Sequence, residues 1–159
     1  MLFLWAVLAV CRSAAQEPVP VHFESYTINE GLSQGFISDV LQDRQGFMWF
    51  GTNDGLNKYD GYTFTVFRHN PADINSLAGD DISCLFEDSQ QRLWIGVQGK
   101  GIDVFDPGRN SFKHIRQADS GEMRSDFVLG IYEDKTGAFW IRSRAGIDRL
   151  EWKMYYPPN

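Results

Sequence analysis

The stretch QDRQGFMWFGTNDGLNKYDGYTF, residues 42–64, decides the fold of this chain. Its closely spaced aspartates, glycines and aromatic residues could belong either to a chemical site or to a structural unit that recurs. The same order of residues returns in ISCLFEDSQQRLWIGVQGKGIDVFDPG, from Ile82, and in VLGIYEDKTGAFWIRSRAGIDRLEW, from Val128. A pattern that recurs at a nearly constant period indicates a repeat architecture.

The repeat is defined by residues that return every 45 or 46 positions. Tryptophan and aspartate recur in all three copies, as does a glycine that follows the tryptophan, and a second glycine occurs in copies one and three. These positions are Asp43, Gly46, Trp49 and Gly55; Asp88, Trp94 and Gly101; and Asp134, Gly137, Trp140 and Gly146. The aspartates are expected to accept hydrogen bonds in turns, and the glycines to adopt positive φ.

Each copy divides into four short strands separated by turns. In the first copy these are VLQD, FMWF, LNKYD and FTVF, and MYY is the fourth strand expected in the third copy. Four short antiparallel strands in about 45 residues are typical of a β-propeller blade. We therefore predict an all-β chain of three four-stranded antiparallel blades that form part of a larger propeller.

A structural origin explains the repeated residues better than catalysis does, because catalytic groups seldom occur once in every repeat. The tryptophans are expected to fill the layers between blades, where each sheet presents an apolar face. We predict no catalytic residue, no cofactor and no metal site.

The N-terminus has the features of an export signal. Nine apolar residues run from Leu2 to Val10, and Ser13 and Ala15 suit a cleavage before Gln16. A lipoprotein signal ending at Cys11 is an alternative. We predict a signal peptide at 1–15, an N-terminal strand at 16–30 that could close the ring of the whole propeller, and blades at about 31–74, 75–121 and 122–159.

The motif EGLSQGFISDVLQDRQGFMWFGTNDGLNKYDGYTF, followed by SLAGDDISCLFEDSQQRLWIG, resembles the two-component regulator propeller repeat. The resemblance covers residues 31 to about 152. It implies the periplasmic sensor region of a hybrid histidine kinase or of a membrane-anchored diguanylate cyclase. The intact receptor would be a homodimer, held in the inner membrane by a later helix, and this chain would be its N-terminal fragment.

The partners implied are the remaining blades of the same chain and a small-molecule or oligosaccharide ligand. Nucleic acid is not expected, because the formal net charge is −6 and repels phosphate. Two alternatives stay open, namely an exported propeller enzyme of the lyase or glycosidase type and an oligomeric propeller adaptor.

Residues that break the repeat are the candidates for function. Arg142 and Arg144 stand where the first copy has Gly51 and Asn53, and they could bind an anionic or hydroxyl-rich ligand. The alternative is surface ion pairs with Glu133, Asp134 or Glu151. His69 and His114 are expected to face solvent at the ends of fourth strands, and Cys84 is expected to be a packed residue rather than a reactive thiol.

Overall fold

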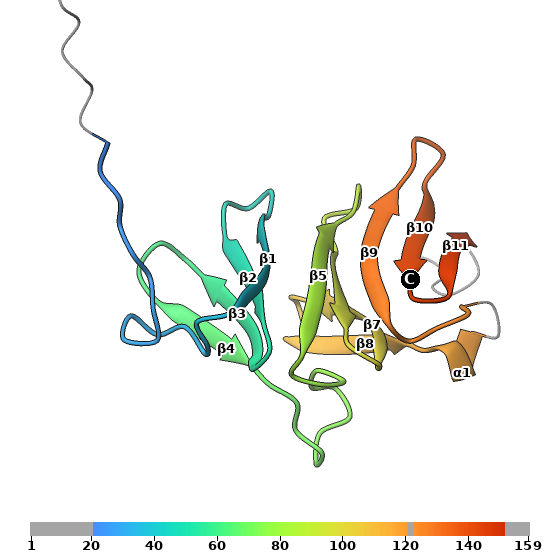
Figure 1. The fold of residues 1–159 in the computed structure, drawn as a ribbon, viewed down its shortest axis with the longest axis horizontal. Helices are drawn as coiled ribbons and strands as arrows, with labels where there is room; N and C mark the ends of the chain where they lie inside the picture. The colour runs from blue at the N-terminus through green and yellow to red at the C-terminus, as the bar shows by residue number, and fades with distance from the viewer. Residues whose placement is uncertain (1–20, 121–122, 152–159) are drawn as a thin grey trace, which may run out of the picture.

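The computed structural model describes residues 21–120 and 123–151 as three antiparallel β-sheets that stand side by side in sequence order (Figure 1). Only one short helix, α1 (Gln117–Ser120), occurs in the described residues. The fold prediction is confirmed: the chain is all-β, and its sheets are blades of a propeller.

The first and second sheets each contain four strands, paired in chain order. The first consists of β1 (Ile37–Gln42), β2 (Met48–Thr52), β3 (Gly55–Tyr59) and β4 (Phe64–Phe67). The second consists of β5 (Ile82–Glu87), β6 (Leu93–Val97), β7 (Gly101–Asp106) and β8 (Ser111–Ile115).

The third sheet contains β9 (Val128–Glu133), β10 (Ala138–Ser143) and β11 (Gly146–Glu151), paired in the order β11-β10-β9. The fourth strand predicted for this copy, at 154–156, lies outside the described residues. The first strands β1, β5 and β9 contact one another in succession, so the sheets pack face against face along a common edge.

Two hydrophobic layers hold the three sheets together. The layer between the first and second sheets contains Trp49, which is 2% exposed, and it buries Leu56, Leu77, Ile82, Ile95, Phe105 and Phe112. The layer between the second and third sheets contains the fully buried Trp94, with Ile102, Val104, Val128, Phe139 and Ile141. Each layer mixes aromatic and branched aliphatic side chains, as packed sheets require.

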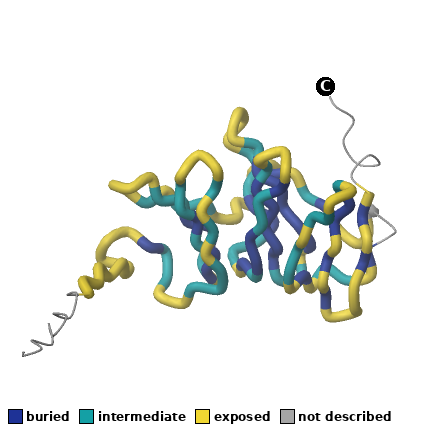
Figure 2. The backbone as a smooth tube through the Cα atoms, turned by 90° about the horizontal axis from the view of Figure 1, so that it is seen from above, coloured by how far each residue is buried: buried dark blue, intermediate teal, exposed yellow. Residues whose placement is uncertain are grey.

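The second sheet is the most buried because it has a neighbour on both faces (Figure 2). All five residues of β6 are buried. Trp94 stacks on Phe139 of the third sheet, with ring centroids 4.2 Å apart, and Trp49 meets Phe105 of the second sheet edge-on at 5.4 Å. Trp140, the equivalent in the third sheet, is 40% exposed on the outer face.

Residues 21–27 form no strand, although a strand was predicted within 16–30. Tyr26 instead packs against Tyr59 of the first sheet, with ring centroids 5.2 Å apart, while Phe23 is largely exposed. A ring-closing strand would have to pair with the last blade of the propeller, so that role stays a prediction. The signal peptide at 1–15 lies outside the described residues.

Candidate functional site

The recurring aspartate and tryptophan are joined by a hydrogen bond in every copy. The indole Nε1 donates to the carboxylate Oδ2 at 2.8 Å from Trp49 to Asp43, from Trp94 to Asp88 and from Trp140 to Asp134. The other carboxylate oxygen accepts backbone N–H groups of the turn, such as those of Gln90 and Arg92 at 2.9 Å on Asp88. One aspartate thus shapes a turn and orients the tryptophan of the next strand.

The recurring glycines adopt the left-handed backbone conformation. Between the second and third strands, φ is 102° at Gly55, 87° at Gly101 and 124° at Gly146. In the first hairpin, φ is 93° at Gly46 and 82° at Gly137. The second copy has no glycine there, and Gln91 adopts the same region with φ of 63°.

A third recurring contact was not recognised in the sequence. A buried side chain on each third strand accepts the N–H of the loop before its sheet: Asn57 from Ser33 at 2.9 Å, Asp103 from Ala78 at 2.7 Å and Asp148 from Arg124 at 3.0 Å. The sequence signal was an Asn or Asp two residues after the repeated glycine. Because the column mixes an amide with two carboxylates, it gave no sign of a shared role.

His114 is not solvent-facing, so that prediction was wrong. Its Nδ1 lies 2.6 Å from Asp103 Oδ1 and its Nε2 lies 2.9 Å from the carbonyl oxygen of Ile74. Both neighbours offer acceptor oxygens, so this arrangement favours the imidazolium, in which both ring nitrogens are donors. The hydrogen bond to Asp103 raises the pKa of His114. The side chain therefore ties the loop before the second sheet to β8.

Neighbouring sheets are also connected by a repeated backbone-to-carboxylate contact. The N–H of Arg44, just after Asp43, donates to Glu87 Oε1 at 3.1 Å. The N–H of Ser89, just after Asp88, donates to Glu133 Oε2 at 2.6 Å. The residue after each recurring aspartate therefore binds a glutamate on the following sheet.

Arg142 and Arg144 have different neighbours. Arg142 donates from Nη2 to the carbonyl oxygen of Leu129 at 2.9 Å and lies along the outer face of the third sheet. The guanidinium of Arg144 lies 4.7 Å from the ring centre of Phe127, in a cation–π contact. The two guanidinium groups therefore contact different residues and do not form one site.

The ion pairs expected for these arginines are not formed among residues 21–120 and 123–151. Glu133 accepts from Ser89, and Glu151 pairs with Arg149 at 2.6 Å. Asp134 holds its turn, where hydrogen bonds from Thr136 and Trp140 lower the pKa of the carboxyl well below its usual range.

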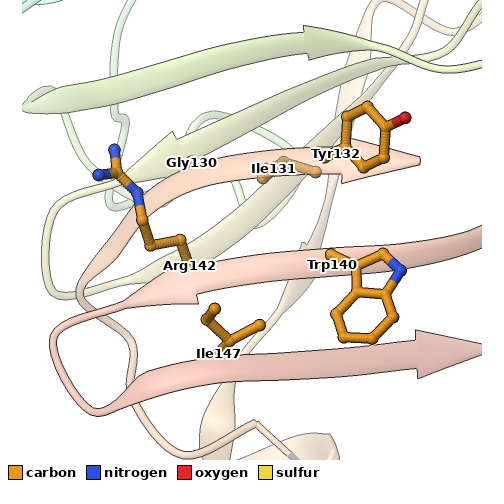
Figure 3. A pocket seen from close by; sticks show the side chains of 6 residues that line it. All are labelled: Gly130, Ile131, Tyr132, Trp140, Arg142 and Ile147. Atoms are coloured by element: carbon orange, nitrogen blue, oxygen red, sulfur yellow. The ribbon is translucent and has the colours of Figure 1, made fainter. Parts of the chain in front are cut away.

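A shallow hollow of about 320 Å³ lies on the outer face of the third sheet (Figure 3). It is lined by Gly130, Ile131, Tyr132, Trp140, Arg142 and Ile147. Tyr132 and Ile147 are each 60% exposed. The hollow combines aromatic surface with the cationic side chain of Arg142.

Cys84 is a packed residue on β5. It is 6% exposed, and burial raises the pKa of its thiol to about 11. Such a thiol is protonated at neutral pH and is a poor nucleophile.

Within the described part of the chain, no group of three or more His, Cys, Asp or Glu side chains is placed to hold a metal ion. Over the same residues, no helix is long and apolar enough to span a membrane.

The three stacked antiparallel sheets, with a tryptophan and an aspartate repeated in each, define a segment of a β-propeller. Two stretches, residues 31–54 and 76–99, match the family model described as two component regulator propeller.

Over 56 residues, 35% of its length, the chain is 50% identical to histidine kinase P4 of Formosa agariphila. That stretch is 4% of the kinase. The matched stretch is therefore a small part of that protein.

The structure is similar to extracellular domains of hybrid two component systems from B. thetaiotaomicron. For BT3049 the TM-score is 0.68 at 23% identity, covering 83% of this chain and 20% of that one. For BT4673 it is 0.62 at 25% identity, covering 77% and 17%. PorZ of Porphyromonas gingivalis, a surface component of a secretion system, gives 0.59 at 15% identity over 72% of this chain and 17% of PorZ.

Proposed function

We propose that this chain is a periplasmic, ligand-sensing propeller segment of a bacterial two-component receptor. The observation that carries the proposal is the repeat at 31–54 and 76–99, which matches the two-component regulator propeller family and lies on stacked sheets. Over 56 residues the chain is also 50% identical to a histidine kinase. The segment itself contributes binding, and the chemistry of signalling belongs to other parts of the receptor.

The proposed ligand surface lies at the end of the sheets where second and third strands are joined. Arg144 lies in the β10–β11 turn, and its neighbour Phe127 lies against Gly99 of the β6–β7 turn. Turns on a rigid sheet scaffold are common positions for recognition. An exposed guanidinium beside an aromatic ring suits an anionic or hydroxyl-rich ligand, such as an oligosaccharide that contains uronic acids.

Arg142 contributes less directly to this surface, because its guanidinium lies on the outer face of the third sheet, against Leu129. Of the two arginines that break the repeat, Arg144 is therefore the stronger candidate for contact with ligand. Arg142 remains a candidate for a ligand that extends onto that face.

The output of the intact receptor is proposed to be phosphotransfer by a histidine kinase. The kinase relative favours this output over the diguanylate cyclase alternative. The same proposal includes a homodimeric receptor, anchored in the inner membrane by a helix later in the chain.

The test is the thermal unfolding midpoint of the chain, measured with an oligosaccharide of uronic acids and with its neutral counterpart. A ligand that binds only the folded state raises the midpoint by an amount that grows with the logarithm of one plus the ratio of ligand concentration to Kd. We expect the acidic sugar to raise it, and Arg144→Ala to abolish the rise. Arg149→Ala, an exposed arginine on β11 paired with Glu151, is the matched control. If neither sugar shifts the midpoint, the proposed ligand class is wrong.

A further inference from the structure

One cross-strand pair is inverted in the third sheet. In the first sheet Asp39 of β1 faces Gly51 of β2, and in the second sheet Cys84 of β5 faces Gly96 of β6. In the third sheet the side chain is on the other strand, since Gly130 of β9 faces Arg142 of β10. Arg142 extends across the strand that carries Gly130 (Figure 3). A side chain placed at Gly130 would meet its guanidinium, with Nε 3.4 Å from the new Cβ.

In the first two sheets the first strand of the next sheet passes over this glycine. A Cβ at Gly51 would lie 2.7 Å from Ile82 Cγ2, closer than real Cβ contacts. A Cβ at Gly96 would be in ordinary contact with Val128 Cγ1 at 3.4 Å, and would collide with Cys84 Sγ of its own sheet at 2.5 Å. Ile82 and Val128 are equivalent, since each begins the first strand of the incoming sheet.

The inversion also changes the hydrogen-bonding character of the face. Asp39 Oδ2 accepts the N–H of Leu85 from the next sheet at 2.8 Å. Arg142 can only donate hydrogen bonds. An aliphatic residue set against this guanidinium would bury its charge with the carbonyl oxygen of Leu129 as a hydrogen-bond partner but with no opposite charge, which is unfavourable.

We propose that the outer face of the third sheet receives a further four-stranded blade whose first strand begins with a carboxylate side chain. That carboxylate would occupy the position held by Ile82 and Val128 in the two existing interfaces and would pair with Arg142. Arg142 thereby selects the next blade and rejects blades that begin with an aliphatic residue.

The rest of this face continues the existing interfaces, which is why a blade is the occupant. Trp140, Tyr132 and Ile147 occupy the positions that Trp94, Phe86 and Ile102 fill in the layer between the second and third sheets. Lys135 follows Asp134 as Arg44 follows Asp43 and Ser89 follows Asp88. Its N–H is therefore placed for a glutamate equivalent to Glu87 and Glu133. This inference rests on the receptor being a longer propeller, but it does not depend on any ligand.

A second copy of this chain does not supply a carboxylate at the start of its first strand. Its first blade would present Ile37, the residue equivalent to Ile82 and Val128, and Gln42 in place of the glutamate. Arg142 therefore opposes head-to-tail association of identical chains. Repeat proteins whose interfaces are all alike can associate head to tail in this way.

The experiment measures self-association of the whole chain by sedimentation across a hundredfold range of concentration. We expect the unmodified chain to be the weakest associator, and Arg142→Gly to lower the dissociation constant at least tenfold. Ile37→Glu should also promote association, because a second copy then supplies the carboxylate. Combining both changes should remove the gain, since the introduced carboxylate would then face glycine. Arg109→Ala, an exposed arginine in the β7–β8 turn that pairs with Asp106, is the control and should leave association unchanged.

The outcomes separate this inference from its alternatives. Thermal unfolding of each variant shows whether it is folded. If Arg142→Gly destabilises the third sheet, Ile37→Glu still tests the proposal, because it changes only the first sheet. The proposal is overturned if Ile37→Glu associates no more than the unmodified chain, or if it associates equally with arginine and with glycine at position 142. Failure of sugar binding leaves these measurements unaffected, so the two proposals fail independently.

Discussion

The indole N–H of Trp94 donates to Asp88 Oδ2 at 2.8 Å, and both side chains are completely buried. Asp88 also accepts two turn N–H groups and pairs with Arg92 Nε at 2.6 Å. The same contact in the third sheet, between Asp134 and Trp140, is exposed on the outer face. One interaction thus occurs in two environments within one chain.

The stability contributed by the recurring aspartate is expected to follow its burial. Asp88→Ala removes the acceptor of one buried indole N–H and of three part-buried donors, and a buried lost partner costs about 1–3 kcal/mol, so we expect a total loss of about 4 kcal/mol. Asp134→Ala exposes its donors to water, and we expect a loss of about 1 kcal/mol. Urea unfolding of the two variants measures the difference. Equal losses would show that the turn, rather than burial of the tryptophan contact, determines the contribution.

The chain is expected to be less stable with glutamine at position 91 than with glycine there. Its φ of 63° lies in the left-handed region, where a non-glycine residue costs about 1–2 kcal/mol. Glycine removes this strain, but part of the stabilisation is offset because glycine has greater conformational freedom in the unfolded chain. Gln91→Gly should therefore raise the free energy of unfolding by about 0.5–1 kcal/mol. The reciprocal control, Gly46→Gln in the first sheet, should lower it by a similar amount.

Gly101 cannot accept a side chain. Its φ is 87°, and a Cβ there would overlap the backbone oxygen of Ile115 on β8. Gly101→Ala should destabilise the chain by about 3 kcal/mol, because both the conformation and the space exclude it. Gly108→Ala is the matched control, since a Cβ there meets only Asp106 Oδ1 at 3.4 Å. Loss of less than about 1 kcal/mol at Gly101 would contradict the geometry.

The repeat period predicted the sheets because turn chemistry and strand alternation are local. Asp43, Gly55 and Trp49 have roles that follow from their neighbours in sequence, and three aligned copies make those roles visible. The pairing of Asp43 with Trp49 was within reach of the same alignment, since the two residues are always six apart. It was missed because each residue already had an explanation of its own.

The contacts that involve His114 and Arg142 depend on more distant residues. His114 is positioned by Ile74, 40 residues earlier, and by Asp103, which no local rule pairs with it. The meaning of Arg142 depends on Gly130 across the sheet and on the space that Ile82 and Val128 fill elsewhere. Alignment of the copies marked Arg142 as a break in the repeat, but only the packing of neighbouring sheets indicates what the break does.

The pairing of His114 with Asp103 makes stability depend on pH. The folded-state pKa of His114 is raised above its unfolded value of about 6.5, with the hydrogen bond to Asp103 as the largest cause. The folded state therefore binds the proton more tightly than the unfolded state does. The stabilisation is complete below about pH 6.5 and is lost as the pH rises through the folded pKa. Arg116 opposes the shift, and the carbonyl of Ile74 supports it.

We expect the free energy of unfolding of the unmodified chain to fall between about pH 6.5 and pH 8.5 by more than that of His114→Gln. Glutamine can still donate one hydrogen bond but carries no charge, so the variant isolates the contribution of the proton. His69→Gln is the control, because its ring contacts the carbonyl of Leu77 and has no carboxylate partner in the described structure. Parallel curves for the unmodified chain and His114→Gln would mean that folding does not raise the pKa of His114. A direct NMR titration of His114 would then place its pKa at or below the unfolded value.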